Sequence, residues 1–136
     1  MATCLLDTVT FSLLMERHPR VLAQVTAAVP DHFVIVCTVV RGEILYALAR
    51  MAQGRRRRHL EATAQNLFAQ FPCEPIREDA ADIYARVKTE TERQGTPLDD
   101  NDLWIAATAL AHRAILVSSD TDFRRVDGLE VQDWTV

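Results

Sequence analysis

The chain has 136 residues, of which 49% are hydrophobic and 25% are charged, a composition typical of one globular domain whose core needs no disulfide bonds. The net charge of −4 argues against a general nucleic-acid binder, and the three cysteines and four histidines are too scattered for a disulfide framework or a zinc site. No apolar run is long enough to span a bilayer and no leader segment is evident, so we expect a cytoplasmic protein with no membrane partner and a single domain over residues 1–136.

The first half of the chain alternates short apolar runs, which predict buried strands, with segments whose apolar residues recur at helical spacing. β-Branched residues dominate the second apolar run, which favours a strand there. Thr38 stands directly after that run and is expected to cap the following helix. The expected strands are residues 3–6 and 33–37, and the expected helices are residues 9–17, 20–29, 39–52 and about 55–70.

The second half continues this alternation. Its clearest amphipathic helix is expected at residues 79–93, and another helix, apolar almost all round and therefore buried, is expected from about residue 100 to residue 112. The remaining expected strands are residues 73–76, 114–117 and 129–131, the last at an edge. Because apolar strands alternate with helices, the sequence predicts an α/β fold, a three-layer α/β/α sandwich around a central, mainly parallel sheet.

Acidic residues follow two of the predicted strands. Asp7 comes directly after the first strand, and Asp120 and Asp122 follow the strand at 114–117. Most aspartates in such positions are only loop residues or helix caps, but ligands of a parallel sheet bind at the carboxyl ends of its strands. Two acidic strand ends in one sheet therefore favour a shared site. Glu43 adds to this, because it borders the buried stripe of its helix and does not face open water.

Three aspartates stand where the buried helix after residue 99 begins. Asp99 is expected to be the N-cap, Asp100 an exposed acid favoured by the helix dipole, and Asp102 the third helical residue. A variant of the capping box would explain Asp102 without any further role. The apolar helix that follows should, however, hold its own start against the edge of the sheet. We therefore expect Asp102 to face the other strand-end acids.

Carboxylates gathered without basic partners repel one another and raise one another's pKa values. A hard divalent cation removes that conflict, and an all-oxygen ligand set without histidine or cysteine suits Mg²⁺ or Mn²⁺ better than zinc. Such a site is well suited to hydrolysis of a phosphodiester, because the metal lowers the pKa of the attacking water and offsets developing charge.

Five short motifs occur in an order that resembles a known family. They are LLDT (5–8), RGEILYAL (41–48), NDLWIAATALAH (101–112), LVSSDTDF (116–123) and GLEVQDW (128–134). Together they span nearly the whole chain and resemble the PIN-domain ribonucleases, specifically the VapC toxins of VapBC toxin–antitoxin modules. No single motif is specific, and the resemblance depends on their order and spacing.

The resemblance implies an endoribonuclease that uses water activated by Mg²⁺ or Mn²⁺ to cut RNA. By motif position it implies that the catalytic, metal-binding acids are Asp7, Glu43, Asp102 and Asp120, with Asp122 as a further metal ligand and Thr8 and Ser118 as supporting hydroxyls. It also implies a homodimer and inhibition by a VapB-type antitoxin. One position departs from the family pattern, because Val9 stands where members often have asparagine.

Other α/β proteins with acidic pockets fit the sequence less well. A response-regulator receiver domain needs a lysine after a late strand, but the only lysine is Lys88, in the helix at 79–93. A haloacid-dehalogenase-type phosphatase needs a second aspartate two positions after Asp7, where Val9 stands. The remaining alternative is a catalytically degenerate PIN-fold protein that acts by binding a partner or RNA.

A run of four arginines is the one compact basic feature of this acidic chain. The run comprises Arg55, Arg56, Arg57 and Arg58, at the start of a predicted helix. Positive charge is locally unfavourable at that end of the helix dipole. A solvated surface and a phosphate-binding patch that draws RNA toward an acidic groove are both consistent with the run.

Overall fold

The computed structural model describes all residues from 1 to 136, and its centre is a five-stranded sheet in the order β3-β2-β1-β4-β5 with every neighbouring pair parallel. This confirms the predicted α/β class and parallel sheet. β1 is the middle strand, and residues Leu5 and Leu6 within it are fully buried. The strands are β1 (Thr3–Leu6), β2 (Phe33–Cys37), β3 (Cys73–Glu74), β4 (Ile115–Val117) and β5 (Val131–Gln132).

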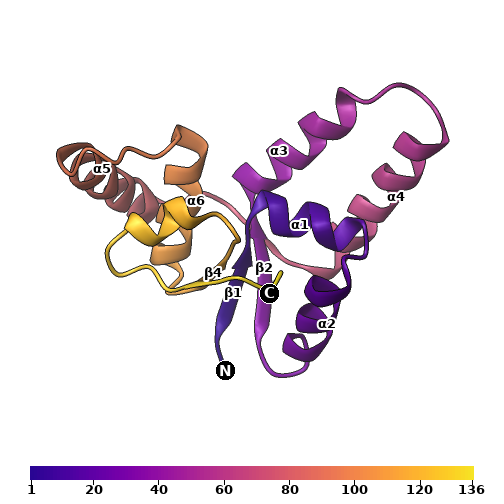
Figure 1. The fold of residues 1–136 in the computed structure, drawn as a ribbon, viewed down its shortest axis with the longest axis horizontal. Helices are drawn as coiled ribbons and strands as arrows, with labels where there is room; N and C mark the ends of the chain where they lie inside the picture. Colours follow the sequence, from indigo (N-terminus) through magenta and orange to yellow (C-terminus); the bar gives the residue numbers. More distant parts are fainter.

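Helices cover both sides of this sheet, as the three-layer prediction requires (Figure 1). Figure 1 shows α5 and α6 on one side and α1 to α4 on the other, with α3 and α4 projecting as a pair. The helices are α1 (Thr8–Met15), α2 (Pro19–Ala28), α3 (Thr38–Ala49), α4 (Arg55–Gln70), α5 (Glu78–Arg93) and α6 (Asp100–Ala111), and a 3₁₀ helix, η1, spans Thr121–Arg125. No helix of the structure is both long and apolar enough to cross a membrane.

The two ends of α3 differ from the prediction. Thr38 does not cap α3 but is its first residue, and Cys37, the last residue of β2, is the N-cap without a side-chain hydrogen bond. The strand therefore passes directly into the helix and leaves no loop residue for a cap. The helix stops at Ala49, not at 52, because Met51 N–H bonds to Leu48 C=O at 3.1 Å and tightens the last turn.

Two short strands also have different bounds. β3 covers only residues 73 and 74, since Pro75 has no backbone N–H with which to extend the pairing. β5 begins at Val131, two residues later than predicted, because Leu129 N–H closes a turn to Val126 C=O at 3.3 Å. Gly128 has a φ of 79° in that turn, a left-handed conformation that glycine adopts without strain.

The buried helix α6 is the element that fixes the site. Ala106, Ala107 and Ala109 are completely buried, which confirms that this helix packs on several sides. It ends in a Schellman motif, in which Ala114 N–H bonds to Ala109 C=O at 2.8 Å and Arg113 has a φ of 52°. The chain then enters β4 immediately. The C-terminal end of α6 is thereby held close to the sheet.

Candidate active site

Asp7 lies at the carboxyl end of the central strand β1. Its backbone N–H bonds to Val117 C=O at 3.1 Å, so β4 fixes its position, and its side chain caps α1 by accepting from Thr10 N–H at 2.8 Å. Only 3% of the residue is exposed. Burial raises the pKa of Asp7, although hydrogen bonding to Ser118 and Thr10 offsets part of this rise. The prediction that Asp7 marks a strand end is confirmed.

Glu43 lies in the second turn of α3 and is held from two sides. The Thr8 hydroxyl donates to Glu43 Oε1 at 2.6 Å, and the Asn101 amide lies within 3.4 Å of Glu43 Oε2. Thr8 comes directly after Asp7 and Asn101 directly before Asp102. These two hydrogen bonds therefore link the first three acids through polar neighbours.

Asp120 and Asp122 follow β4 but differ in their surroundings. The carboxylate of Asp120 caps η1 through Asp122 N–H at 2.9 Å, and Asp120 N–H donates to the Ser118 hydroxyl at 3.0 Å. The negative charge of Asp120 raises the pKa values of Asp7 and Asp102. Asp122 instead forms an ion pair with Arg125 at 3.0 Å. The structure thus brings Asp120 to the acidic site and turns Asp122 toward a basic partner.

Asp102 is the carboxylate on which the others act. It occupies the first turn of α6 and is half-buried. Burial raises the pKa of Asp102 to about 6, and the negative charge of Asp99 is the next largest cause. The charges of the other three acids, Asp120, Glu43 and Asp7, add to the same shift. Four segments far apart in the chain therefore contribute carboxylates to one electrostatic cluster (Asp7, Glu43, Asp102 and Asp120), which we call the acid cluster.

The polar residues Asp99 and Asn101 are additions that sequence reasoning missed. Asp99 is the N-cap residue of α6, as predicted, but its side chain makes no capping hydrogen bond and its charge acts on Asp102 instead. Asn101 supports Glu43, while Val9, at the position where the family often has asparagine, is 53% exposed. Asn101 directly precedes Asp102 in the sequence, and this adjacency already indicated that Asn101 lies near the site.

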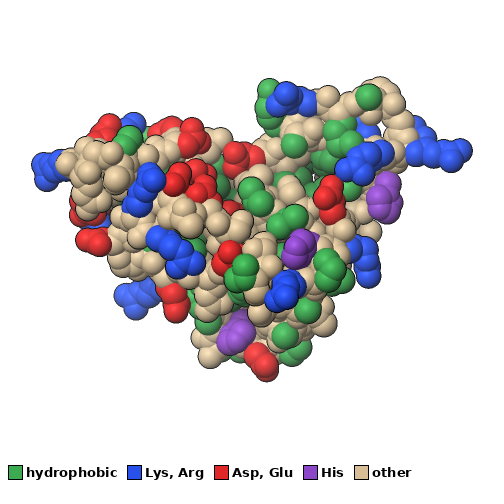
Figure 2. All heavy atoms as spheres, in the orientation of Figure 1, with side chains coloured by type: hydrophobic (Ala, Val, Ile, Leu, Met, Phe, Trp, Pro, Cys, Tyr) green, Lys and Arg blue, Asp and Glu red, His purple; other side chains and the backbone are tan.

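The chemistry of the acid cluster suits a divalent cation. All its donors are carboxylate oxygens, and the charged groups that act most strongly on Asp102 are themselves acids. No group of three or more Asp, Glu, His or Cys side chains is arranged here to hold a metal ion, so the fit lies in the kind of donor and its repulsive surroundings. Figure 2 shows acidic side chains gathered in the notch between the starts of α3 and α6.

The four arginines lie apart from the acid cluster. They begin α4, beyond the far end of α3 from Glu43, and Figure 2 shows basic side chains at that outer end. Arg56 pairs with Glu16 at 3.1 Å, and Arg57 pairs with Glu61 at 3.0 Å. Arg55 and Arg58 form no ion pair. Two of the four arginines are therefore paired with nearby glutamates, and the other two are free of ion pairs.

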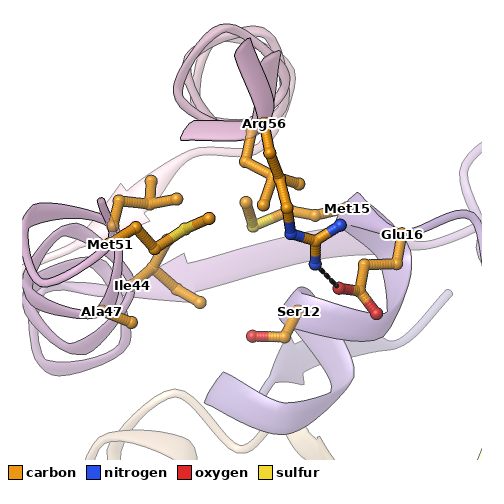
Figure 3. Close-up of a pocket in the computed structure, with 9 residues that line it drawn as sticks. Ser12, Met15, Glu16, Ile44, Ala47, Met51 and Arg56 are labelled. Carbon is orange, nitrogen blue, oxygen red and sulfur yellow. Dashed lines mark hydrogen bonds and ion pairs between the residues drawn. The ribbon is translucent and has the colours of Figure 1, made fainter. Parts of the chain in front are cut away.

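A separate, mostly apolar cavity of about 230 Å³ lies between α1, α3 and α4 (Figure 3). Met15, Ile44 and Met51 point into it, and the Arg56–Glu16 ion pair lies beside it. The cavity contains no member of the acid cluster. The polar residues of its lining are Ser12, Glu16 and Arg56.

Comparison with known proteins gives one consistent result. The PIN-domain family model matches residues 4–129. Ribonuclease VapC1 of Haemophilus influenzae strain R2866 is 28% identical over 134 residues, which cover 96% of this chain and 97% of that protein. The fold matches the crystal structure of FitAcB from Neisseria gonorrhoeae with a TM-score of 0.85 and 26% identity, covering 96% of this chain and 97% of that one.

A further match is the crystal structure of VapBC-5 from Mycobacterium tuberculosis, a member of the VapBC family of toxin–antitoxin systems. Its TM-score is 0.75 at 28% identity, and 97% of each chain is covered. The family model covers most of the sequence, and both structures match along nearly the whole length. The protein therefore belongs to the PIN-domain family, and VapC ribonucleases are its relatives.

Proposed function

We propose that the protein is an endoribonuclease toxin of a toxin–antitoxin module that hydrolyses RNA phosphodiester bonds with the help of Mg²⁺ or Mn²⁺. The observation that carries this proposal is the acid cluster at the carboxyl edge of a parallel sheet, where burial, the charge of Asp99 and the charges of the other three acids together raise the pKa of Asp102 to about 6. The family of the chain and the ribonuclease name of its relative support it. A structural role alone does not explain why several acids are kept together without a basic partner.

In this mechanism, the carboxylates of Asp7, Glu43, Asp102 and Asp120 would hold the cation. When bound, the ion supplies positive charge that offsets the developing charge on the phosphate and lowers the pKa of a water molecule. Polar residues beside these acids fix the orientation of the carboxylates. Thr8 and Asn101 hold the Glu43 carboxylate.

Ser118 has a different supporting role, because its hydroxyl accepts from Asp120 N–H and fixes the start of η1. Asp122 is proposed only as a peripheral acid, since Arg125 already occupies its carboxylate.

RNA cleavage tests this proposal directly. Wild type should cut RNA with Mg²⁺ or Mn²⁺ and stop when EDTA is added, while Asp7→Asn should lose at least about 100-fold in rate. Asparagine also caps helices, so this variant keeps the N-cap of α1 and should fold. Asp122→Asn is the matched control and should keep most of the activity.

The opposing result is equally clear. If wild type shows no metal-dependent cleavage and binds no divalent ion, the chain is a PIN-fold binding protein with a degenerate site.

We further propose that a VapB-type antitoxin inhibits the toxin and that two copies of the chain form a homodimer in the cytoplasm. The similarity to VapBC-5, which is described as a member of a toxin–antitoxin family, supports the antitoxin partner. Size-exclusion chromatography with light scattering, on the chain alone and with the antitoxin encoded beside it, measures both associations. A monomer that forms no complex with that protein would contradict this part of the proposal.

A further inference from the structure

The chain has two tyrosines, and only one of them is packed. Tyr84 in α5 stacks on Trp104 with ring centroids 3.8 Å apart and hydrogen-bonds to Asp100. Tyr46 in α3 stacks on no other ring and is 64% exposed. A large aromatic ring left open to water contributes little to folding, so its position needs another explanation.

Tyr46 lies one helical turn after Glu43, on the same face of α3. Both side chains line an open hollow of about 360 Å³ together with Thr38, Val39, Gly42 and Asn101. Glu43 belongs to the acid cluster, and Asn101 donates to it. The hollow therefore connects the exposed ring directly to the edge of the candidate active site.

Gly42 keeps this hollow open. It lies inside α3 with ordinary helical φ, and a methyl group added to it would meet no atom within 4 Å. Neither tight packing nor backbone conformation therefore requires a glycine here. Glycine inside a helix lowers helix stability relative to alanine, so its presence costs the fold something. Because Gly42 has no side chain, the helix backbone beside Glu43 is left uncovered at this position.

One face of the Tyr46 ring has a cation near it. The Arg50 guanidinium carbon lies 5.4 Å from the ring centroid, within the range of a cation–π contact. Arg50 makes no ion pair with any acid of the chain, so its charge is available to a phosphate. An aromatic ring next to an unpaired guanidinium is the combination that proteins use on single-stranded nucleic acid, one for the base and the other for the backbone.

We propose that Tyr46 is a stacking platform for an unpaired RNA base next to the bond that is cut, with the base seated in the hollow over Gly42 and the adjoining phosphate at Arg50. This inference rests on the proposed ribonuclease function and names a residue that binds its substrate. A base held within a duplex is already stacked and cannot reach the ring, so the contact with Tyr46 requires an unpaired base.

Binding of two RNA probes tests the stacking role without knowledge of the cleavage sequence. In an Asp7→Asn background with EDTA, fluorescence anisotropy is measured on a 12-nucleotide mixed-sequence RNA and on a 12-mer of stable abasic spacers with the same backbone. The parent should bind the RNA roughly 5- to 100-fold more tightly than the abasic probe. Tyr46→Ala should lose most of this preference, whereas Tyr46→Phe and Tyr46→Trp should keep it.

Phe33→Ala is the matched control. Phe33 is 59% exposed but begins β2, so it lies at the opposite end of the strand from the site and should not affect the preference. A Cβ atom at Gly42 meets no atom within 4 Å, so Gly42→Leu should partly fill the hollow and weaken RNA binding while leaving the protein folded by circular dichroism.

The results that overturn the inference are distinct from failure of the proposed function. If wild type cuts RNA but Tyr46→Ala keeps the full preference for base-bearing RNA, only the stacking role is wrong. If Tyr46→Ala instead changes the association state in sedimentation, the ring is a contact between copies of the chain. If wild type cuts no RNA at all, the proposed function and this inference both fail.

Discussion

Asp102 is subject to two opposing electrostatic effects. Its place in the first turn of α6 puts it near the positive end of the helix dipole, which favours a carboxylate by about 0.3–1 kcal/mol. Burial and the nearby carboxylates act in the other direction and prevail, because they raise the pKa of Asp102 to about 6. The charge therefore destabilises the folded chain at neutral pH, which is the kind of cost that functional sites impose.

We predict that Asp102→Asn removes metal-dependent cleavage but raises the melting temperature of the metal-free protein at pH 7.5. The free energy of unfolding should rise by an amount on the order of 1 kcal/mol, because solvent screening reduces the electrostatic effect of a half-buried carboxyl group. The folded state keeps the proton up to about pH 6, while the unfolded state releases it near 3.8, so wild type loses stability as pH rises between these values. The gain should be largest above pH 6 and absent below about pH 4, as measured by thermal unfolding in EDTA.

Asp100→Asn is the control for this experiment. Asp100 is on the same turn and is exposed, as predicted, and it also hydrogen-bonds to Tyr84 and lies 3.8 Å from Lys88 Nζ. This variant should keep cleavage and lose up to about 1 kcal/mol of stability. A rise in melting temperature equal to that of Asp102→Asn would show only a general benefit of lower negative charge.

The sequence predicted three acids that act electrostatically on Asp102, but not the orientation of the residues beside them. Asp7, Asp102 and Asp120 were recognised because their positions follow from strand ends and a helix start. The role of Asp99 was misjudged, because cap preference fixes the position of a residue and not its rotamer. The ion pair of Asp122 with Arg125 depends on the turn of η1, which the sequence did not indicate.

At the scale of the elements, the start of α4 separates two kinds of arginine. Arg55 and Arg58 are exposed and unpaired. The Arg57 guanidinium donates to the Met51 carbonyl at 3.1 Å and thereby ties α4 to the end of α3. We expect Arg55 and Arg58 to contribute to RNA binding and Arg57 to contribute to the stability of the fold.

The double variant Arg55→Gln with Arg58→Gln should lower the slope of log affinity for RNA against log salt by about 1 to 2 and leave the melting temperature unchanged. Arg57→Gln should instead lower stability by about 0.5–1.5 kcal/mol with a smaller change in slope. Salt titrations of RNA binding and thermal unfolding measure both. An unchanged salt slope in the double variant would show that the run is a solvated surface.

The presence of a helix or strand could be predicted where apolar residues recurred with a clear period. The residues at which these elements begin and end could not be predicted in this way. The helices at α5 and α6 and the strand β2 agree with the sequence pattern, because burial on one or more sides dictates their residues. The end of α3 and the extent of β5 depend on single backbone hydrogen bonds in the adjoining turns. Propensity carries little information about such bonds.

At the scale of the whole molecule, a bound cation should stabilise the fold, because it relieves repulsion between carboxylates that folding alone brings together. We predict that millimolar Mn²⁺ or Mg²⁺ raises the melting temperature of wild type by several degrees, in proportion to the logarithm of metal concentration. Asp102→Asn should show a much smaller rise, and EDTA should reverse the effect in wild type. Equal rises in both proteins would place the ion elsewhere on the chain.

The overall architecture followed from the sequence more completely than the site did. Apolar strands separated by helices leave a parallel sheet as the only way to bury both faces, and the structure has one. The strand order was not encoded in any local pattern. It depends on pairings such as Cys4 with Ile115, between segments more than 100 residues apart.

Those long-range pairings have a consequence for the synthesis of the protein. The acid cluster takes Asp7 from the first strand and Asp120 from beyond the fourth, so no shorter nascent chain can assemble it. At ordinary rates of translation of about 5 to 20 residues per second, the 113 residues from Thr8 to Asp120 take about 6 to 23 s to synthesise. During that interval the emerging chain is surrounded by ribosomal and messenger RNA but lacks one of its four acids. The topology thus delays the complete site until the ribosome has almost finished translating the domain.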